Sequence, residues 1–105
     1  MSGISTHVLD TANGRPAAGI TVRLFLADRV IGSGVTEQDG RLRTLLPEGT
    51  TLVPGVYRIL FEIGDYFTQG FYPEVAISFS VRDSAAHYHV PLLISPYGYT
   101  TYRGS

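Results

Sequence analysis

Hydrophobic and polar residues alternate along most of the chain, in short runs that are separated by turn residues. In the clearest run, residues 74–81, Val75, Ile77, Phe79 and Val81 occupy alternate positions between small or polar residues. A period of two residues is typical of a β-strand with one buried face. About eight such runs follow one another at a spacing of roughly 8–12 residues, usually with a turn signal between them. The pattern predicts an antiparallel β-sandwich or small barrel.

Local patterns predict the remaining elements. Strands are expected over residues 4–10, 20–26, 30–36, 41–45, 56–63, 74–81 and 87–94, with a last strand after the Ser-Pro-Tyr-Gly turn at 95–98. The 56–63 run is heavily apolar, which favours a central strand. Residues 65–70 begin with Asp and end with Gly, so one or two helical turns are expected there. No repeat or linker divides the sequence, so residues 1–105 are expected to form one domain.

The low charge of the chain excludes two classes of partner. Charged residues make up 16% of the sequence and the formal net charge is −1. A nucleic-acid-binding surface needs clustered basic residues, and a membrane-surface helix needs a basic amphipathic stretch; the sequence has neither. A surface with so little charge also suggests that partner subunits cover part of it.

The sequence contains no cysteine, so it has no disulfide, thiol nucleophile or thiolate metal site. Residues 1–5 carry neither the basic nor the apolar segment of a secretory signal, and no apolar run reaches the length of a transmembrane helix. Absence of cysteine fits the cytoplasm. We therefore expect a cytoplasmic protein.

His87 and His89 are the first candidates for chemistry. They alternate along a strand whose other face is apolar, so they share its polar side. Three interpretations are open: ordinary surface histidines, a metal site that needs His7 as third ligand, or a catalytic base near a cation such as Arg41. The metal site is disfavoured because neither cysteine nor an acidic cluster accompanies the pair. Pattern alone leaves the orientation of His7 open.

Pro91 follows these histidines closely and restricts their strand. Because proline donates no ladder hydrogen bond, we expect it at an edge, a bulge or a strand start. A bulge there would re-aim His89, as bulges beside active sites often do.

Elsewhere, Arg41 and Arg43 share one face of their strand, although a solvated arginine after a turn is common. Asp10 and Asp39 are expected to be turn or cap residues, and no Gly-x-Ser-x-Gly nucleophile elbow is present.

Several short motifs together give the chain a family resemblance. They are Thr-His-Val-Leu-Asp at 6–10, Gly-Arg-Pro-Ala at 14–17, Asp-Gly-Arg at 39–41, Pro-Gly-Val-Tyr at 54–57, Phe-Tyr-Pro-Glu-Val at 71–75, His-Tyr-His-Val-Pro-Leu-Leu at 87–93 and Tyr-Arg-Gly-Ser at 102–105. With these motifs, residues 4–105 resemble the transthyretin-related 5-hydroxyisourate hydrolases. The connection at 69–71 is shorter than in many such enzymes, but the motifs themselves are intact.

The resemblance implies a prealbumin-type, transthyretin-like β-sandwich of two four-stranded sheets with one short helix. His7, Arg41, His89 and the C-terminal tail would then belong to one sheet, with His7 pointing outward. The family also implies a homotetramer, a dimer of dimers, whose active sites lie where the faces of two subunits meet. Such an assembly would explain the low surface charge.

The reaction that the resemblance implies is hydrolytic opening of the six-membered ring of 5-hydroxyisourate in urate degradation, without metal or cofactor. The implied catalytic residues are His7, Arg41, His89 and Ser105. The implied substrate-binding residues are His7, Arg41, Tyr102, Arg103, Gly104 and Ser105. Two rival functions remain: a transthyretin-like carrier of a small hydrophobic ligand, and a plain adhesion or assembly sandwich. The carriers have other residues at the positions of His7, Arg41 and His89 and lack the Tyr-Arg-Gly-Ser ending.

Overall fold

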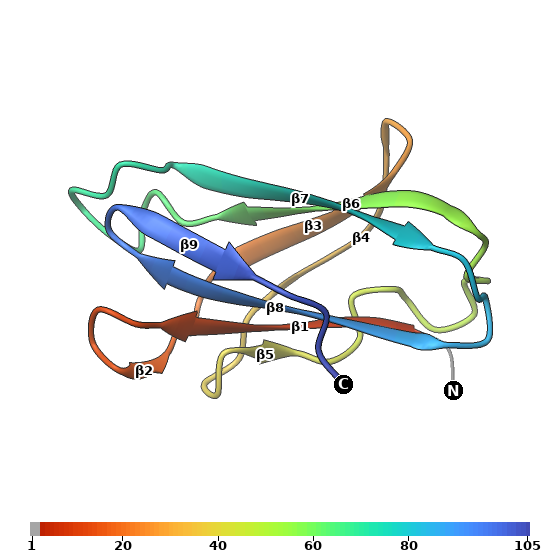
Figure 1. The fold of residues 1–105 in the computed structure, drawn as a ribbon, viewed down its shortest axis with the longest axis horizontal. Coiled ribbons are helices and arrows are strands. Elements are labelled where there is room, and N and C mark those ends of the chain that lie inside the picture. Colours follow the sequence, from red (N-terminus) through yellow and green to blue (C-terminus); the bar gives the residue numbers. More distant parts are fainter. Residues whose placement is uncertain (1–2) are drawn as a thin grey trace.

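The computed structural model describes residues 3–105, and these residues form two β-sheets packed face to face (Figure 1). The strands of this part of the chain are β1 (Gly3–Asp10), β2 (Arg15–Pro16), β3 (Thr21–Leu26), β4 (Arg29–Val35), β5 (Arg41–Leu42), β6 (Gly55–Glu62), β7 (Glu74–Val81), β8 (His87–Ser95) and β9 (Gly98–Thr101). One sheet has the order β2-β1-β8-β9, with β5 paired to β1, and the other has the order β4-β3-β6-β7. The predicted all-β, transthyretin-like sandwich is confirmed.

The central pair of the first sheet is the exception to antiparallel pairing. β1 and β8 run parallel over eight residue pairs, from Gly3↔His87 to Asp10↔Ile94, whereas the other neighbouring strands are antiparallel. A parallel pair joins segments that are far apart in sequence, and 76 residues separate the end of β1 from the start of β8 (Asp10 to His87). Local alternation carries no information about such a pairing, so the sequence did not predict it.

The core between the sheets is built from the alternating residues. On β8, Tyr88, Val90, Leu92 and Ile94 are buried, as the pattern predicts, while His87 is exposed and His89 is half-buried. The predicted central position of the 56–63 run is also confirmed, because β6 lies between β3 and β7. Burial of this many aliphatic and aromatic side chains is the main source of stability in such a sandwich. The outer face of the first sheet is thereby left free for polar residues.

Pro91 lies in the middle of β8, so the prediction of an edge, a bulge or a strand start is wrong. The β8–β9 ladder ends at Leu92↔Thr101, and an isolated bridge then pairs His89 with Gly104 in the same register. That register places Pro91 opposite Tyr102, where proline has no N–H to donate. The Thr101 hydroxyl donates to the Pro91 carbonyl instead, at 2.7 Å. Proline therefore interrupts the ladder without bending the strand, and no bulge re-aims His89.

The helical turns expected over residues 65–70 are also wrong. Phe67 N reaches the Ile63 carbonyl at 3.4 Å, but the next bond, from Gly70 N to the Phe67 carbonyl, is a three-residue turn, so the helix is not continued. Ile63 N and Gly64 N both donate to the Pro73 carbonyl, which closes the connection on itself and leaves little chain for a helix. Among residues 3–105 there is therefore no helix that could cross a membrane.

Asp10 fastens this connection to the first sheet. Its side chain is 1% exposed and accepts hydrogen bonds from Ala12 N, from Asn13 N and Nδ2, and from the Tyr66 hydroxyl at 2.8 Å. Burial alone would raise the pKa of this carboxyl, but the hydrogen bonds together outweigh burial and hold its pKa below the usual value. The ionised carboxylate therefore stabilises the fold.

We predict that Asp10→Ala lowers the free energy of unfolding by about 2–4 kcal/mol at neutral pH, because four donors, on Ala12, Asn13 and Tyr66, lose their shared acceptor at a buried position. The folded pKa of Asp10 is lowered, so its contribution is complete above the unfolded value, about 3.9, and is lost as the pH falls through the folded value. Urea unfolding at pH 7 and pH 3 checks both points. The matched control is Asp65→Ala, which removes an exposed carboxylate from the same connection. Equal effects of the two substitutions would contradict the prediction.

Candidate active site

Strand register brings the candidate residues to one outer face of the first sheet. His7 on β1 pairs with Arg41 on β5 on one side and with Pro91 on β8 on the other, while Ser5 pairs with His89. Paired residues point to the same face of a sheet. Ile4, Thr6 and Val8 are buried toward the other sheet, so the outward orientation that the resemblance implied for His7 agrees with the structure.

A cavity of about 220 Å³ opens on this face. Its lining residues are Ser5, Thr6, Arg41, Arg43, His87, His89 and Ser105. Beyond β9 the tail continues and then bends across β8 (Figure 1), and Ser105 lines the same cavity as Arg41. Three residues of the predicted catalytic set therefore meet at one cavity, and the fourth, His7, is the strand partner of Arg41.

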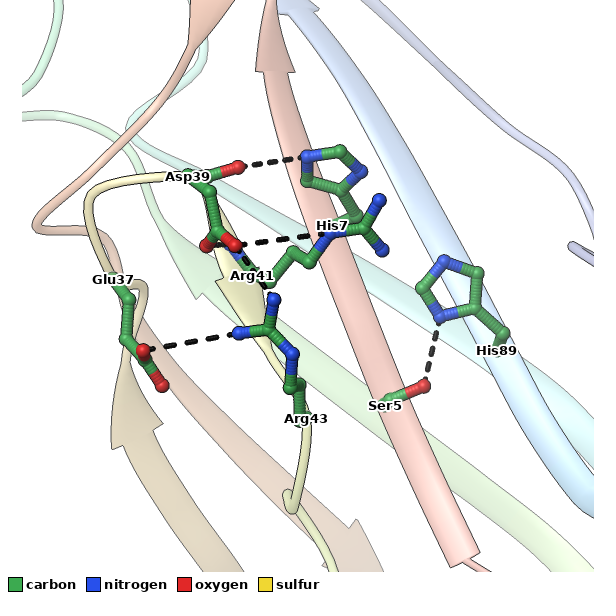
Figure 2. A network of polar contacts seen from close by, with 7 residues as sticks. All are labelled: Ser5, His7, Glu37, Asp39, Arg41, Arg43 and His89. Atoms are coloured by element: carbon green, nitrogen blue, oxygen red, sulfur yellow. Dashed lines mark hydrogen bonds and ion pairs between the residues drawn. The ribbon is translucent and has the colours of Figure 1, made fainter.

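The tautomer of His7 follows from its hydrogen bond. His7 Nε2 lies 2.8 Å from the Asp39 carbonyl oxygen (Figure 2). A backbone carbonyl can only accept, so the proton of the neutral ring is on Nε2. The lone pair is then on Nδ1, the nitrogen that can accept a proton from another group.

The turn before β5 supplies this carbonyl and also orients Arg41. Asp39 Oδ1 accepts a hydrogen bond from Arg41 N, and Asp39 Oδ2 lies 2.7 Å from the Arg43 guanidinium and 3.8 Å from Arg41 Nε (Figure 2). The Arg43 hydrogen bond, the Arg41 amide and both positive charges lower the pKa of Asp39. Gly40 has φ +76°, and a Cβ there would lie 2.4 Å from the Val8 carbonyl oxygen. Only glycine lets the turn seat this closely against β1.

Ser5 connects the two histidines of β8. Its hydroxyl oxygen lies 2.8 Å from His87 Nε2 and 2.8 Å from His89 Nδ1. His89 Nε2 has no hydrogen bond to any residue in 3–105 and is left for another partner. Burial lowers the pKa of His89, and the nearby charges of Arg41, His7 and His87 lower it further. The neutral imidazole is therefore the favoured form of His89 at pH 7.

The tail residues take different positions. Gly104 N donates to the His89 carbonyl at 2.9 Å, and a Cβ at Gly104 would lie 2.5 Å from His89 Cδ2, so this glycine packs against the imidazole. Tyr102 is 56% exposed. The Arg103 guanidinium lies 4.7 Å from the centre of the Tyr88 ring, which belongs to the core-facing side of β8. In this chain Arg103 is thus directed away from the face that carries His7 and Arg41.

Sequence reasoning missed Ser5, Asp39 and Arg43 as parts of this site. Ser5 was detectable in principle, because it shares the alternation of His7 on β1. Asp39 was assigned only a turn role, and its carbonyl contact with His7 depends on the pairing of β5 with β1, which no local pattern encodes. Within residues 3–105 no group of three acidic, histidine or cysteine side chains is placed to hold a metal ion.

The chain is similar to known proteins in both sequence and fold. A model of the HIUase/Transthyretin family matches residues 4–104. The chain is 45% identical over 117 residues to the 5-hydroxyisourate hydrolase of Caulobacter vibrioides, with 100% of both chains covered. The structure of Klebsiella pneumoniae 5-hydroxyisourate hydrolase superimposes with a TM-score of 0.89 at 36% identity, covering 100% of both chains.

A transthyretin has the same fold but is less similar in sequence. The structure of transthyretin from Sparus aurata superimposes with a TM-score of 0.87 at 28% identity, covering 99% of this chain and 97% of that one. Fold similarity therefore does not separate hydrolases from transthyretins, whereas identity is higher for the hydrolases. The match to the family model and the identity to the Caulobacter vibrioides enzyme lead to one conclusion: the chain belongs to the HIUase/Transthyretin family.

Proposed function

We propose that this protein hydrolyses 5-hydroxyisourate in purine degradation. Water would attack the N1–C6 amide of the six-membered ring and give 2-oxo-4-hydroxy-4-carboxy-5-ureidoimidazoline. The observation that carries the proposal is the state of His7: the Asp39 carbonyl holds the proton on Nε2, beside Arg41, and leaves Nδ1 as a base. Relatives named 5-hydroxyisourate hydrolase support the choice of substrate.

His7 is the base in the proposed mechanism. Nδ1 takes a proton from the attacking water, and the Asp39 carbonyl, which accepts from Nε2–H, stabilises the imidazolium that forms. As the C6–N1 bond breaks, the imidazolium returns this proton to N1, which becomes the terminal amino group of the ureido chain. An imidazole is suited to this step because its pKa is close to neutral. A positioned base typically contributes about 10²–10⁴ in rate.

Arg41 stabilises the oxyanion that develops on the C6 oxygen. Among residues 3–105 its guanidinium makes one ion pair, with Asp39 at 3.8 Å, so its remaining N–H groups are available to substrate. A fixed donor aimed at developing negative charge is worth on the order of 10²–10³ in known cases. His89 and Ser105 line the same cavity and would contact the substrate beside the reacting carbonyl.

The charge of the cavity argues against the rival carrier function. Two guanidinium groups and two imidazoles line it. Its three other lining residues are Ser or Thr, so none of the seven is a hydrophobic residue. Small hydrophobic ligands bind in pockets with mainly apolar walls. An oxygen-rich purine derivative matches the donors present.

With no cysteine in the chain, we retain the cytoplasm as the proposed compartment.

We further propose that a second subunit completes the site in a homotetramer. The cavity of about 220 Å³ is smaller than the roughly 300–1,000 Å³ of typical ligand pockets. Alternation places Leu9 and Leu93, which pair across β1 and β8, on the face that carries His7 and His89, and Tyr102 is exposed. A second copy packed on these apolar residues would deepen the cavity and exclude water.

The first test is a set of single substitutions. We predict that His7→Ala, Arg41→Ala and His89→Ala each reduce turnover more than about tenfold, because each removes a group that contacts water, oxyanion or substrate. Turnover is measured as the absorbance decay of freshly generated 5-hydroxyisourate, corrected for the spontaneous reaction. Arg29→Ala, at an exposed position on the opposite sheet, serves as control. If the unsubstituted protein does not accelerate the decay, the proposed function is wrong.

The second test concerns the charge state of His89. Its pKa is lowered, so its NMR titration midpoint should lie below the ordinary value of about 6.5, and Arg41→Gln should raise it by removing one positive neighbour. Because the unfolded chain takes up this proton first, the free energy of unfolding should fall as the pH drops below that value. A midpoint above 6.5, or one that does not respond to Arg41→Gln, would contradict the assignment.

The third test addresses assembly. We predict that specific activity falls when dilution shifts the protein from tetramer to monomer, since the shared cavity then opens to water. Activity and sedimentation are measured over the same range of concentrations. Full activity in an isolated monomer would refute the shared site and leave the hydrolase proposal intact.

A further inference from the structure

The Ser5 hydroxyl is in contact with two imidazoles at once. It lies 2.8 Å from His87 Nε2 and 2.8 Å from His89 Nδ1, and Ser5 is 7% exposed. A hydroxyl donates one hydrogen bond and can accept two. Among residues 3–105 the two imidazoles are the only hydrogen-bond partners of Ser5 Oγ, so the hydroxyl proton goes to one ring and the oxygen accepts from the other. The tautomers of His87 and His89 are therefore coupled through this one oxygen atom.

Two arrangements satisfy both contacts. In the first, His87 Nε2–H donates to Ser5 Oγ, the hydroxyl donates to His89 Nδ1, and the His89 proton is on Nε2. In the second, His89 Nδ1–H donates to Ser5 Oγ, and the hydroxyl donates to a bare His87 Nε2. A protonated His87 and a neutral His87 with its proton on Nε2 both require the first arrangement. Only the remaining tautomer of His87 permits the second.

The surroundings of the two rings also favour the first arrangement. His87 is exposed, whereas His89 is half-buried and is faced by Arg41 and His7 from β5 and β1. Arg43 lines the cavity from the same side. Burial and these positive groups disfavour a protonated His89, which would have to donate from Nδ1 and so would require the second arrangement. A neutral His89 can instead accept from the Ser5 hydroxyl at Nδ1, as in the first arrangement.

We propose that Ser5 and His87 are positioning residues that hold His89 in the tautomer with its proton on Nε2. In this form His89 is a neutral hydrogen-bond donor toward the substrate, complementary to His7, whose free nitrogen accepts. The inference rests on the proposed function for its kinetic consequence only. The tautomer itself is a property of the resting protein.

The tautomer is measured directly by ¹⁵N NMR of histidine-labelled protein, in which protonated and bare ring nitrogens differ in chemical shift. We expect neutral His89 to carry its proton on Nε2 in the unsubstituted protein. Ser5→Ala and His87→Met should each convert it to a mixture of tautomers. His87→Gln is the matched control, because its amide N–H can donate from nearly the position of His87 Nε2.

Kinetics provide the second measurement. We expect Ser5→Ala and His87→Met each to lower kcat roughly tenfold, as wrong orientation of a catalytic imidazole does elsewhere, with KM changed less than about twofold. His87→Gln should retain most of kcat. The double substitution should be no worse than Ser5→Ala alone, because both residues act along one chain of hydrogen bonds. His87 is exposed, so His87→Met is not expected to impair folding.

Two outcomes would overturn the inference. One is a neutral His89 with its proton on Nδ1 in the unsubstituted protein; the other is equal behaviour of His87→Met and His87→Gln in tautomer and kcat. If the unsubstituted protein does not hydrolyse 5-hydroxyisourate, the proposed function fails, while the NMR result still decides the tautomer.

Discussion

The parallel pairing of β1 with β8 is the constraint on which the rest of the structure depends. Its register sets Ser5 beside His89 and His7 beside Pro91, and it buries Ile4 and Val8 with Tyr88 and Val90 on the other face. A shift of one residue would turn every one of these side chains to the opposite face. The same hydrophobic energy that fixes the core therefore fixes the positions of the imidazoles, without any interaction devoted to the site alone.

Around this pair, the backbone of two other segments finishes the arrangement. The turn at Asp39 and Gly40 packs against β1, and its Asp39 carbonyl accepts a hydrogen bond from His7. Gly104 packs against β8 and lies next to the His89 ring. Both segments rely on glycine where a Cβ would collide with a neighbour. Each histidine is thus oriented by a different kind of contact: His7 by a main-chain acceptor and His89 by a side-chain hydroxyl together with a packed glycine.

The sequence predicted most of this fold, and its failures have physical causes. Alternation located the strands and their buried faces because burial imposes a period of two on each strand independently. The helix expected over residues 65–70 does not form. Its capping residues are local signals, whereas the hydrogen bonds from Ile63 N and Gly64 N to the Pro73 carbonyl, which lies outside that segment, set the path of the connection. The position of Pro91 was wrongly predicted because this proline lies just past the end of the short β8–β9 ladder. A central strand tolerates it there, since the absent N–H removes only one hydrogen bond. The parallel partner of β1 was beyond any local pattern.

For the candidate site, the sequence supplied the residue types and the family resemblance supplied their grouping. What neither could supply were contacts made by main-chain atoms and by an unremarkable serine, since the Asp39 carbonyl and the Ser5 hydroxyl matter only once β5 and β8 flank β1. The interrupted ladder at Pro91 has one more consequence. Beyond Thr101 the tail is held against β8 by one backbone hydrogen bond, from Gly104 N to the His89 carbonyl, and by the contact of Arg103 with the Tyr88 ring, so the place of Ser105 in the cavity depends on these two contacts.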